Sequence, residues 1–219
     1  NCMVMLTGSK FYQSPPFCGA LLVPKTISSK LTNITNEAVA PFLDIFSTSD
    51  ISSDHPILRS KFRENENYGT LLRWEAAISE MKLLSFYGED MVTMAIDRWN
   101  AFVISQLQVN SKYFELMPDQ QFTNRSIISF NVKHPDGSLL TDEELRKLYL
   151  KICADERDDF YDFKKIIIGQ PVKYDNKSFI RLALGSFNVR MLIASEFDFK
   201  FDRKLVKIIV KELEALFWT

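Results

Sequence analysis

The sequence predicts an α/β protein, with two short strands and two long helices before residue 117 and a small α+β domain over residues 117–219. Three observations predict this. Two short apolar runs flank a proline-containing loop near the start of the chain. Two long helical patterns follow, up to about residue 109. After Met117-Pro118 the pattern changes to β-α-β-β-α, the order of a sheet with helices on one face.

The first predicted elements are two short strands. The run Cys2–Leu6 is apolar and enters the turn Thr7-Gly8-Ser9, and the run Gly19–Val23 is apolar too. Their composition indicates buried strands, which we expect to form a hairpin-like pair with Lys10 in the connecting loop. Pro15-Pro16 excludes regular structure within that loop.

The middle of the chain predicts loops and then two helices. Residues 26–66 are rich in Ser, Thr and Asn, and they predict one short helix near 36–46 within irregular loop. From 70 to 87 and from 89 to 109, apolar residues recur at helical spacing. Gly88, between the two helices, is placed as a C-terminal cap.

The last hundred residues predict the small domain. The pattern predicts strands at 126–132, 165–168 and 178–184, and helices from Thr141 to about Ala154 and from Phe201 to Phe217. Thr141 and Glu144 form a capping box, which marks the start of the first of these helices. Pro135-Asp136-Gly137 predicts a turn.

Composition excludes several classes of protein. The 27 Lys and Arg residues nearly balance 28 Asp and Glu, so we expect no strongly cationic nucleic-acid surface. His55 and His134 are far apart, and Cys2, Cys18 and Cys153 include no CxxC pair, so we expect neither a metal site nor a disulfide framework. No apolar run approaches the length of a membrane helix. These features favour a reducing, cytoplasmic location, with Cys18 and Cys153 as packing residues.

Lys10 is the first candidate for chemistry. In a tight loop between two apolar strands, its ammonium group would be partly desolvated, which lowers its pKa and frees an amine for Schiff-base formation. The hydroxyls of Thr7 and Ser9, with nearby backbone N–H groups, are suited to hold a phosphate beside that amine. The alternative is a surface lysine at a loop tip.

Arg181 is the second candidate. Its neighbours Phe179, Ile180, Leu182 and Leu184 indicate a mostly buried strand, where an unpaired charge would be costly. A guanidinium group binds a carboxylate through two parallel hydrogen bonds, so Arg181 is suited to orient an amino acid by its α-carboxylate. The alternative is a structural ion pair.

Three segments together resemble the class V aminotransferase-like family of fold-type I pyridoxal-phosphate enzymes. The first segment is Thr7-Gly-Ser-Lys10 with Pro15-Pro16 and Gly19-Ala-Leu-Leu, similar to the family's cofactor-lysine segment. The second is Tyr68-Gly69-Thr70, and the third runs from Arg181 to Phe187-Asn188 with the family's spacing.

The chain also departs from the family pattern. Ser14 stands where a glycine is usual, the loop has one extra residue, Ala183 replaces a usual Ser and Val189 a usual Thr. The resemblance covers the second half of the family's length, and it implies that residues 1–116 are the C-terminal part of a large α/β domain that binds the cofactor. We therefore expect the N-terminal half of the same enzyme, with the remaining cofactor contacts, to lie upstream.

The resemblance implies a cofactor, a substrate class and a set of site residues. The cofactor is pyridoxal 5'-phosphate and the substrate an amino acid or amine, in a homodimer with its sites at the subunit interface. The implied roles are catalysis and Schiff-base formation for Lys10, phosphate contacts for Thr7 and Ser9, a contact to the partner's phosphate for Thr70, and substrate binding for Arg181 and Asn188. The reaction itself stays open.

Two alternatives remain beside this interpretation. In the first alternative, the chain is a non-catalytic interaction protein that retains the scaffold. In the second, it is an unrelated α+β protein in which the motif matches are accidental. On the enzyme interpretation, we expect Lys10 and Arg181 to open into one cleft. We also expect the chain alone to expose apolar surface at its first two strands, because the upstream half and a second subunit would cover it.

Overall fold

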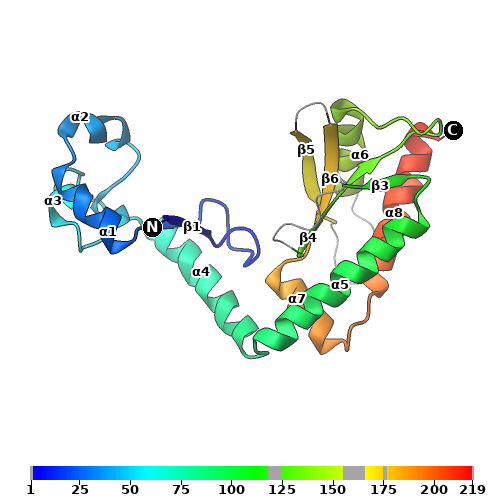
Figure 1. The fold of residues 1–219 in the computed structure, drawn as a ribbon, viewed down its shortest axis with the longest axis horizontal. Coiled ribbons are helices and arrows are strands. Elements are labelled where there is room, and N and C mark those ends of the chain that lie inside the picture. The colour runs from blue at the N-terminus through cyan, green and yellow to red at the C-terminus, as the bar shows by residue number, and fades with distance from the viewer. Residues whose placement is uncertain (1, 118–124, 155–165, 175–176, 219) are drawn as a thin grey trace. The chain divides into compact units, whose positions relative to one another are not determined.

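The chain is a mixed α/β protein with two small sheets (Figure 1). The computed structural model describes residues 2–117, 125–154, 166–174 and 177–218. Two compact units divide the chain, Asn1–Leu83 and Leu84–Thr219. The division falls after Leu83, whereas the sequence predicted a domain boundary between residues 116 and 117. It lies earlier in the chain because the second long helix, residues 89–109, packs on the elements that follow it.

The first unit begins with the expected hairpin and continues through short turns into a long helix. Its elements are β1 (Val4–Thr7), β2 (Gly19–Leu22), α1 (Lys25–Ser28), η1 (Ser29–Asn33), α2 (Asn36–Val39), η2 (Ala40–Phe42), η3 (Thr48–Asp50), α3 (Pro56–Arg59) and most of α4 (Tyr68–Ser85). β1 and β2 pair antiparallel, with Val4 opposite Leu22 and Thr7 opposite Gly19. The predicted hairpin-like pair is therefore confirmed.

The hairpin differs from the prediction in its burial. Its strands were expected to be buried, but Met5 is 86% exposed and Leu21 and Leu22 are also exposed. Two four-residue strands make too small a sheet to bury both of their own faces. The exposure agrees with the expectation that the chain alone presents apolar surface here.

Residues 26–66 form several short helical turns instead of one helix near 36–46. Helix α2 begins where expected, and Thr35 caps it by accepting a hydrogen bond from the Ala38 N–H at 3.3 Å. It ends after one turn and is followed by a 3₁₀ turn that contains Pro41. Proline has no N–H to donate, so the α-helical ladder does not continue through it.

The two long predicted helices are confirmed. Helix α4 begins at Tyr68 because Asn67 caps it, with the Thr70 N–H donating to Asn67 Oδ1 at 3.0 Å. Helix α5 spans Glu89–Val109. Gly88 lies between them at φ +73°, a left-handed conformation that glycine adopts without a steric penalty.

The second unit is a sheet with helices packed on one side (Figure 1). Its elements are α5, β3 (Phe114–Leu116), β4 (Ile127–Val132), α6 (Asp142–Ala154), β5 (Gly169–Tyr174), β6 (Lys177–Ala183), α7 (Ser186–Ala194) and α8 (Lys200–Phe217). The strand order is β3-β4-β6-β5, and all neighbouring strands are antiparallel. The order of strands and helices after residue 125 agrees with the predicted β-α-β-β-α order, while β3 and α7 are additions to it.

The two faces of this sheet differ in character. One face is buried against α5 and α6, on which α8 packs in turn. This face consists of Ile128, Phe130, Val132, Ile180 and Leu182. Because side chains alternate along a strand, the residues between them lie on the opposite face. Ser129 and Arg181 are paired across β4 and β6 on that opposite face, which we call the second face of the sheet.

The strand predicted at 165–168 is wrong by several residues. Lys165 lies outside the described residues, and Ile166 to Ile168 have no strand pairing. Strand β5 starts at Gly169, opposite Arg181. Ile166 and Ile168 are buried while Ile167 is 74% exposed. This alternation of buried and exposed residues is typical of a strand, but the pairing with β6 begins only at Gly169.

The start of helix α6 is built as the sequence predicts. The Thr141 N–H donates to Glu144 Oε2 at 2.9 Å, and the Glu144 N–H donates back to Thr141 Oγ1 at 3.4 Å. The backbone hydrogen bond from Thr141, helped by His134 at 3.2 Å, lowers the pKa of Glu144. The predicted turn at residues 135–137 is also present, with Gly137 at φ +87°.

Asp202 connects helix α8 to helix α5. Its Oδ1 accepts a hydrogen bond from Trp99 Nε1 at 2.8 Å. Burial penalises the ionised form and raises the pKa of Asp202, although the hydrogen bond from Trp99 opposes this. The folded state therefore holds the Asp202 proton to a higher pH than the unfolded chain does.

We expect Asp202→Asn to remove a pH-dependent loss of stability. Because the pKa of Asp202 is raised on folding, its stabilising effect is present below the unfolded pKa and declines as pH rises through the folded pKa. The amide oxygen of asparagine still accepts from Trp99. The free energy of unfolding of the variant, measured in denaturant from pH 3.5 to 7, should rise relative to the wild type across this interval. A constant difference would contradict the prediction.

Candidate functional site

The loop that carries Lys10 is closed by backbone hydrogen bonds. The Gly8 N–H donates to the Cys18 carbonyl at 2.9 Å, and the Ser14 N–H donates to the Gly8 carbonyl at 3.0 Å. A turn over residues 10–13 is held by the Gln13 N–H, which donates to the Lys10 carbonyl at 3.1 Å. The loop is thus a defined structure at the end of the β1–β2 hairpin.

Helix α4 supports this loop from one side. Ser14 Oγ donates to the Arg73 carbonyl at 2.7 Å. A Cβ atom at Gly8 would lie 2.6 Å from Ala77 Cβ and 2.7 Å from Cys18 Sγ, so the loop backbone packs directly on the helix. Cys18 is 1% exposed, as its predicted packing role requires. The Ser14 hydroxyl thus anchors the loop to α4.

Lys10 itself is exposed, so the partial desolvation expected for its ammonium group is absent from this structure. Two hydroxyl groups lie close to it in the sequence, and Thr7 Oγ1 is 3.0 Å from Ser9 Oγ. The loop therefore presents an accessible amine together with a pair of neighbouring hydroxyls. That combination can bind an aldehyde and an anion.

Thr70 lies in the first turn of α4, on the same helix that supports the Lys10 loop. Its backbone N–H is occupied by Asn67, whose Nδ2 donates in turn to Asp50 Oδ1 at 2.9 Å. This chain of bonds fixes the start of the helix. The Thr70 side chain is half-buried.

Arg73 was not singled out by the sequence. It lies on helix α4, where its carbonyl contacts Ser14 of the Lys10 loop and its guanidinium lies next to Gly69. Its Nε is buried and has no hydrogen-bond partner in the part of the chain that the structure describes. Its Nη1 would lie 2.8 Å from a Cβ atom at Gly69, so the guanidinium packs over that glycine. The sequence signal is a basic residue four positions after a helix-starting glycine, a weak pattern by itself.

Arg181 is positioned in the centre of the second sheet. It lies on the second face of the sheet, between Ser129 on β4 and Gly169 on β5. A Cβ atom at Gly169 would come within 2.7 Å of the Arg181 carbonyl oxygen, so the backbones approach as closely as glycine allows. Among the described residues, Arg181 Nε has no hydrogen-bond partner, although it is buried. The alternative of a structural ion pair therefore finds no support in the described residues.

Asn188 belongs to helix α7, which starts directly after the strand that carries Arg181. Gly185 is the N-cap, and Asn188 is the third residue of the helix and half-buried. Ser186, at the first position, is fully buried, and its Oγ lacks a hydrogen-bond partner within the described segments. Asn188 therefore lies in the first turn of a helix that the sequence did not predict.

The structure brings together two groups of the predicted site residues. Thr7, Ser9, Lys10 and Thr70 lie in the first unit, and Arg181 and Asn188 lie in the second. The prediction that Lys10 and Arg181 share one cleft stays a prediction. Groups of three or more metal-ligating side chains suited to a metal ion are not found among the described residues.

We expect Gly8→Ala to loosen the Lys10 loop. The new methyl group would collide with Ala77 and Cys18, and an overpacked contact of this kind costs about 1–3 kcal/mol. Gly19→Ala is the matched control, because its Cβ would meet only the Leu6 carbonyl oxygen at 3.8 Å. Hydrogen exchange over residues 4–22 should become faster in the Gly8 variant alone. Equal exchange in both variants would show that the loop does not depend on this packing.

In the part of the chain that the structure describes, no helix combines the length and the apolar character needed to cross a membrane. No protein-family model, curated protein or solved structure matches the chain.

Proposed function

We propose that this protein is a pyridoxal-phosphate-dependent enzyme of the class V aminotransferase-like, fold-type I kind, acting on an amino acid or amine. The observation that carries the proposal is the Lys10 loop. An accessible lysine follows two neighbouring hydroxyls in a loop that is fastened at its base and against helix α4. Such support holds a reactive side chain in a defined place, which catalysis requires.

The residues of the first unit fit the chemistry of the cofactor. An exposed primary amine suits its aldehyde, and the Thr7 and Ser9 hydroxyls, 3.0 Å apart, suit its phosphate. Arg73 has a buried N–H to spare on the helix that supports this loop, and we include it among the phosphate-binding candidates. Thr70 keeps its proposed role toward the cofactor of a second subunit in a homodimer.

The proposed roles follow from these groups. Lys10 binds the cofactor through its amine and then carries the α-proton of the substrate as a general acid and base. Arg181 orients the substrate by its carboxylate, and Asn188, in the first turn of helix α7, also binds the substrate. The cofactor, when bound, serves as an electron sink that stabilises the substrate carbanion.

One observation favours the non-catalytic alternative. Lys10 is exposed, whereas amines that act as nucleophiles are commonly desolvated. Pyridoxal phosphate discriminates between the two proposals, because an enzyme of this kind gains a visible absorbance band with the cofactor and a binding scaffold does not.

The experiment uses the protein together with the upstream half that the resemblance implies, because the 219-residue chain alone should bind the cofactor poorly. This protein is titrated with pyridoxal phosphate, reduced with borohydride and analysed by peptide mass spectrometry. We expect a visible band before reduction and a stable adduct on the peptide that contains Lys10. An adduct on another lysine, or on none, would remove Lys10 from the proposed role and leave the non-catalytic scaffold as the better interpretation.

A further inference from the structure

An exposed row of side chains runs along helix α4 on the side away from the Lys10 loop. The row consists of Leu72, Ala76, Ser79 and Leu83, and all four are exposed. The two leucines, one at each end, are 68% and 42% exposed. The other side of the helix carries the fully buried Ala77, against which the Lys10 loop packs. Helix α4 therefore has one side occupied by its own chain and a second side that is suited to contact another protein segment.

The spacing of the row is typical of two helices that pack along a shared seam. Its members follow one another at steps of four, three and four residues, the alternation found in coiled coils. Large residues stand at the two ends and small residues in the middle. The steps and the sizes thus have the same order in both directions, so the row fits a second copy of itself that runs the opposite way.

A twofold axis through the middle of the row generates this arrangement. It places Ala76 opposite Ser79 of a second copy, and Leu72 opposite Leu83, with each contact occurring twice. The small pair lets the two helices approach closely, and the leucines pack together at both ends of the contact. Such an interface uses the same surface on both copies, so it produces a dimer and no larger assembly.

The charged residues beside the row match the same arrangement. Glu75 and Lys82 lie along one flank, and Arg73 and Glu80 lie along the other. Because the twofold axis reverses the second helix, each flank faces the same flank of the second copy. Glu75 then lies opposite Lys82, and Arg73 opposite Glu80, so these pairs join opposite charges.

Other arrangements and partners match these charges less well. In a parallel pair of helices, unlike flanks meet, and Glu75 would face Glu80 of the second copy, where like charges repel. A strongly acidic or strongly basic partner would meet a residue of its own charge on each flank. The order of charges therefore favours a second copy in the antiparallel arrangement.

We propose that the row on α4 is a homodimer interface, in which the α4 helices of two copies of this chain pack antiparallel. The contact spans about three helical turns, which is small, so we expect a weak dimer with a dissociation constant in the micromolar range. Thr70 lies seven residues before Ala77 and hence on the loop side of α4. This interface is therefore separate from the contact proposed for Thr70, and it requires neither Lys10 nor a cofactor.

The test is sedimentation equilibrium of the full 219-residue chain over a range of protein concentrations. We expect the wild type to show a monomer–dimer equilibrium. Glu75→Lys should weaken the dimer about tenfold, because it makes both contacts between positions 75 and 82 repulsive. Lys82→Glu should weaken the dimer to a similar extent. The double variant exchanges the two charges and should restore the wild-type dissociation constant.

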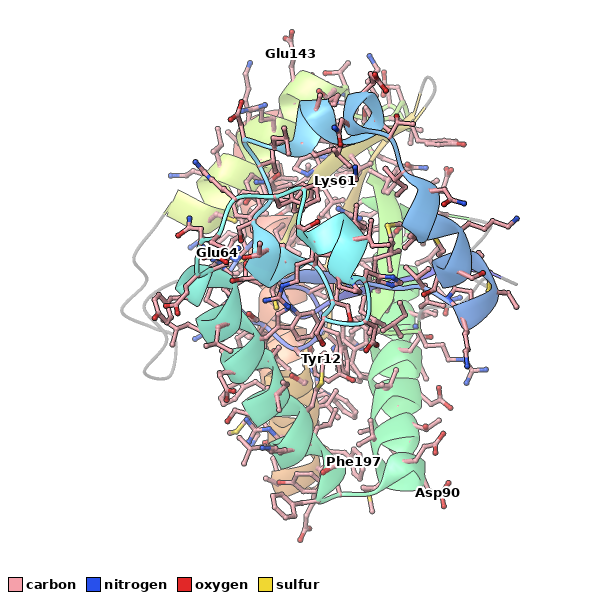
Figure 2. All side chains as sticks on the ribbon, turned by 90° about the vertical axis from the view of Figure 1, so that its left-hand side faces the viewer. Tyr12, Lys61, Glu64, Asp90, Glu143 and Phe197 are labelled. Atoms are coloured by element: carbon pink, nitrogen blue, oxygen red, sulfur yellow. The ribbon has the colours of Figure 1, made fainter. Side chains whose placement is uncertain are left out.

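Two further variants test the row itself and the position of the effect. Ala76→Arg places a long side chain where the helices approach most closely, and it should abolish the dimer. Its circular dichroism should be that of the wild type, because Ala76 is exposed in the single chain. Glu64→Lys is the matched control, since Glu64 is exposed in the loop before α4 (Figure 2) and the change of charge is the same. This variant should dimerise as the wild type does.

Three outcomes would overturn the inference. The first is a wild-type chain that stays monomeric at millimolar concentration. The second is a dimer that persists in Ala76→Arg, since another surface would then hold it together. The third is a dimer strengthened by Glu75→Lys, which would show parallel helices. Sedimentation is measured without pyridoxal phosphate, so this inference and the proposal for Lys10 fail independently of each other.

Discussion

Replacing Lys10 with arginine should abolish the borohydride-stable adduct with pyridoxal phosphate completely. Arginine keeps the positive charge and much of the length of lysine, but its guanidinium does not form the covalent bond to an aldehyde that a primary amine forms. Because Lys10 is exposed and packs in no core, the fold should be unchanged. Circular dichroism checks the fold, and mass spectrometry of reduced peptides checks the adduct.

Lys25→Arg is the control for this result. Lys25 is also exposed and begins the helical turn that follows β2, close to the same hairpin. If accessibility alone determined where pyridoxal phosphate reacts, both lysines would be modified and each variant would lose only its own share. A complete loss in Lys10→Arg with an unchanged adduct in Lys25→Arg supports a specific site. Comparable partial losses in both would contradict it.

Local signals explain why much of the fold was predictable. The capping box of Thr141 and Glu144, the left-handed Gly88 and the periodicity of the two long helices all act within a few residues of the chain. Strand β3 has only three residues, and it exists because Phe114 and its neighbours pair with β4 more than ten positions away. No pattern confined to three residues indicates such a partner.

The candidate site was predictable in its reactive groups and not in their surroundings. A lysine beside hydroxyls, or an arginine in an apolar strand, is visible in the sequence. The fastening of Ser14 to the Arg73 carbonyl joins residues 59 positions apart. Similarly, Glu115 and Asn131 meet only through strand register. These contacts depend on tertiary structure, so sequence patterns pointed to neither Arg73 nor Asn131.

The exposure of Lys10 shows where local reasoning was misleading. Desolvation was expected because the flanking runs are apolar, but apolar strands desolvate a loop only when something covers them. In this structure, the strands of the hairpin are themselves exposed. If a second protein segment covers them, the environment of Lys10 changes as well, so the accessibility of Lys10 and that of the hairpin are linked.

Phe130→Ala should be the most destabilising of the substitutions considered for the second unit. Phe130 is fully buried in β4, and its ring packs edge-on against Phe114 with centroids 5.3 Å apart. Truncation of a buried phenylalanine costs about 3–5 kcal/mol, a large part of the roughly 5–15 kcal/mol that stabilises a typical domain.

Phe86→Ala and Phe130→Leu make this prediction specific. Phe86 is 83% exposed in the turn between α4 and α5, so its truncation should change the free energy of unfolding by no more than about 0.5 kcal/mol. Phe130→Leu fills most of the space and should cost about 1.5 kcal/mol or less. Guanidinium unfolding followed by circular dichroism measures all three variants. If Phe130→Ala proved no more destabilising than Phe86→Ala, Phe130 would not be at the centre of the core.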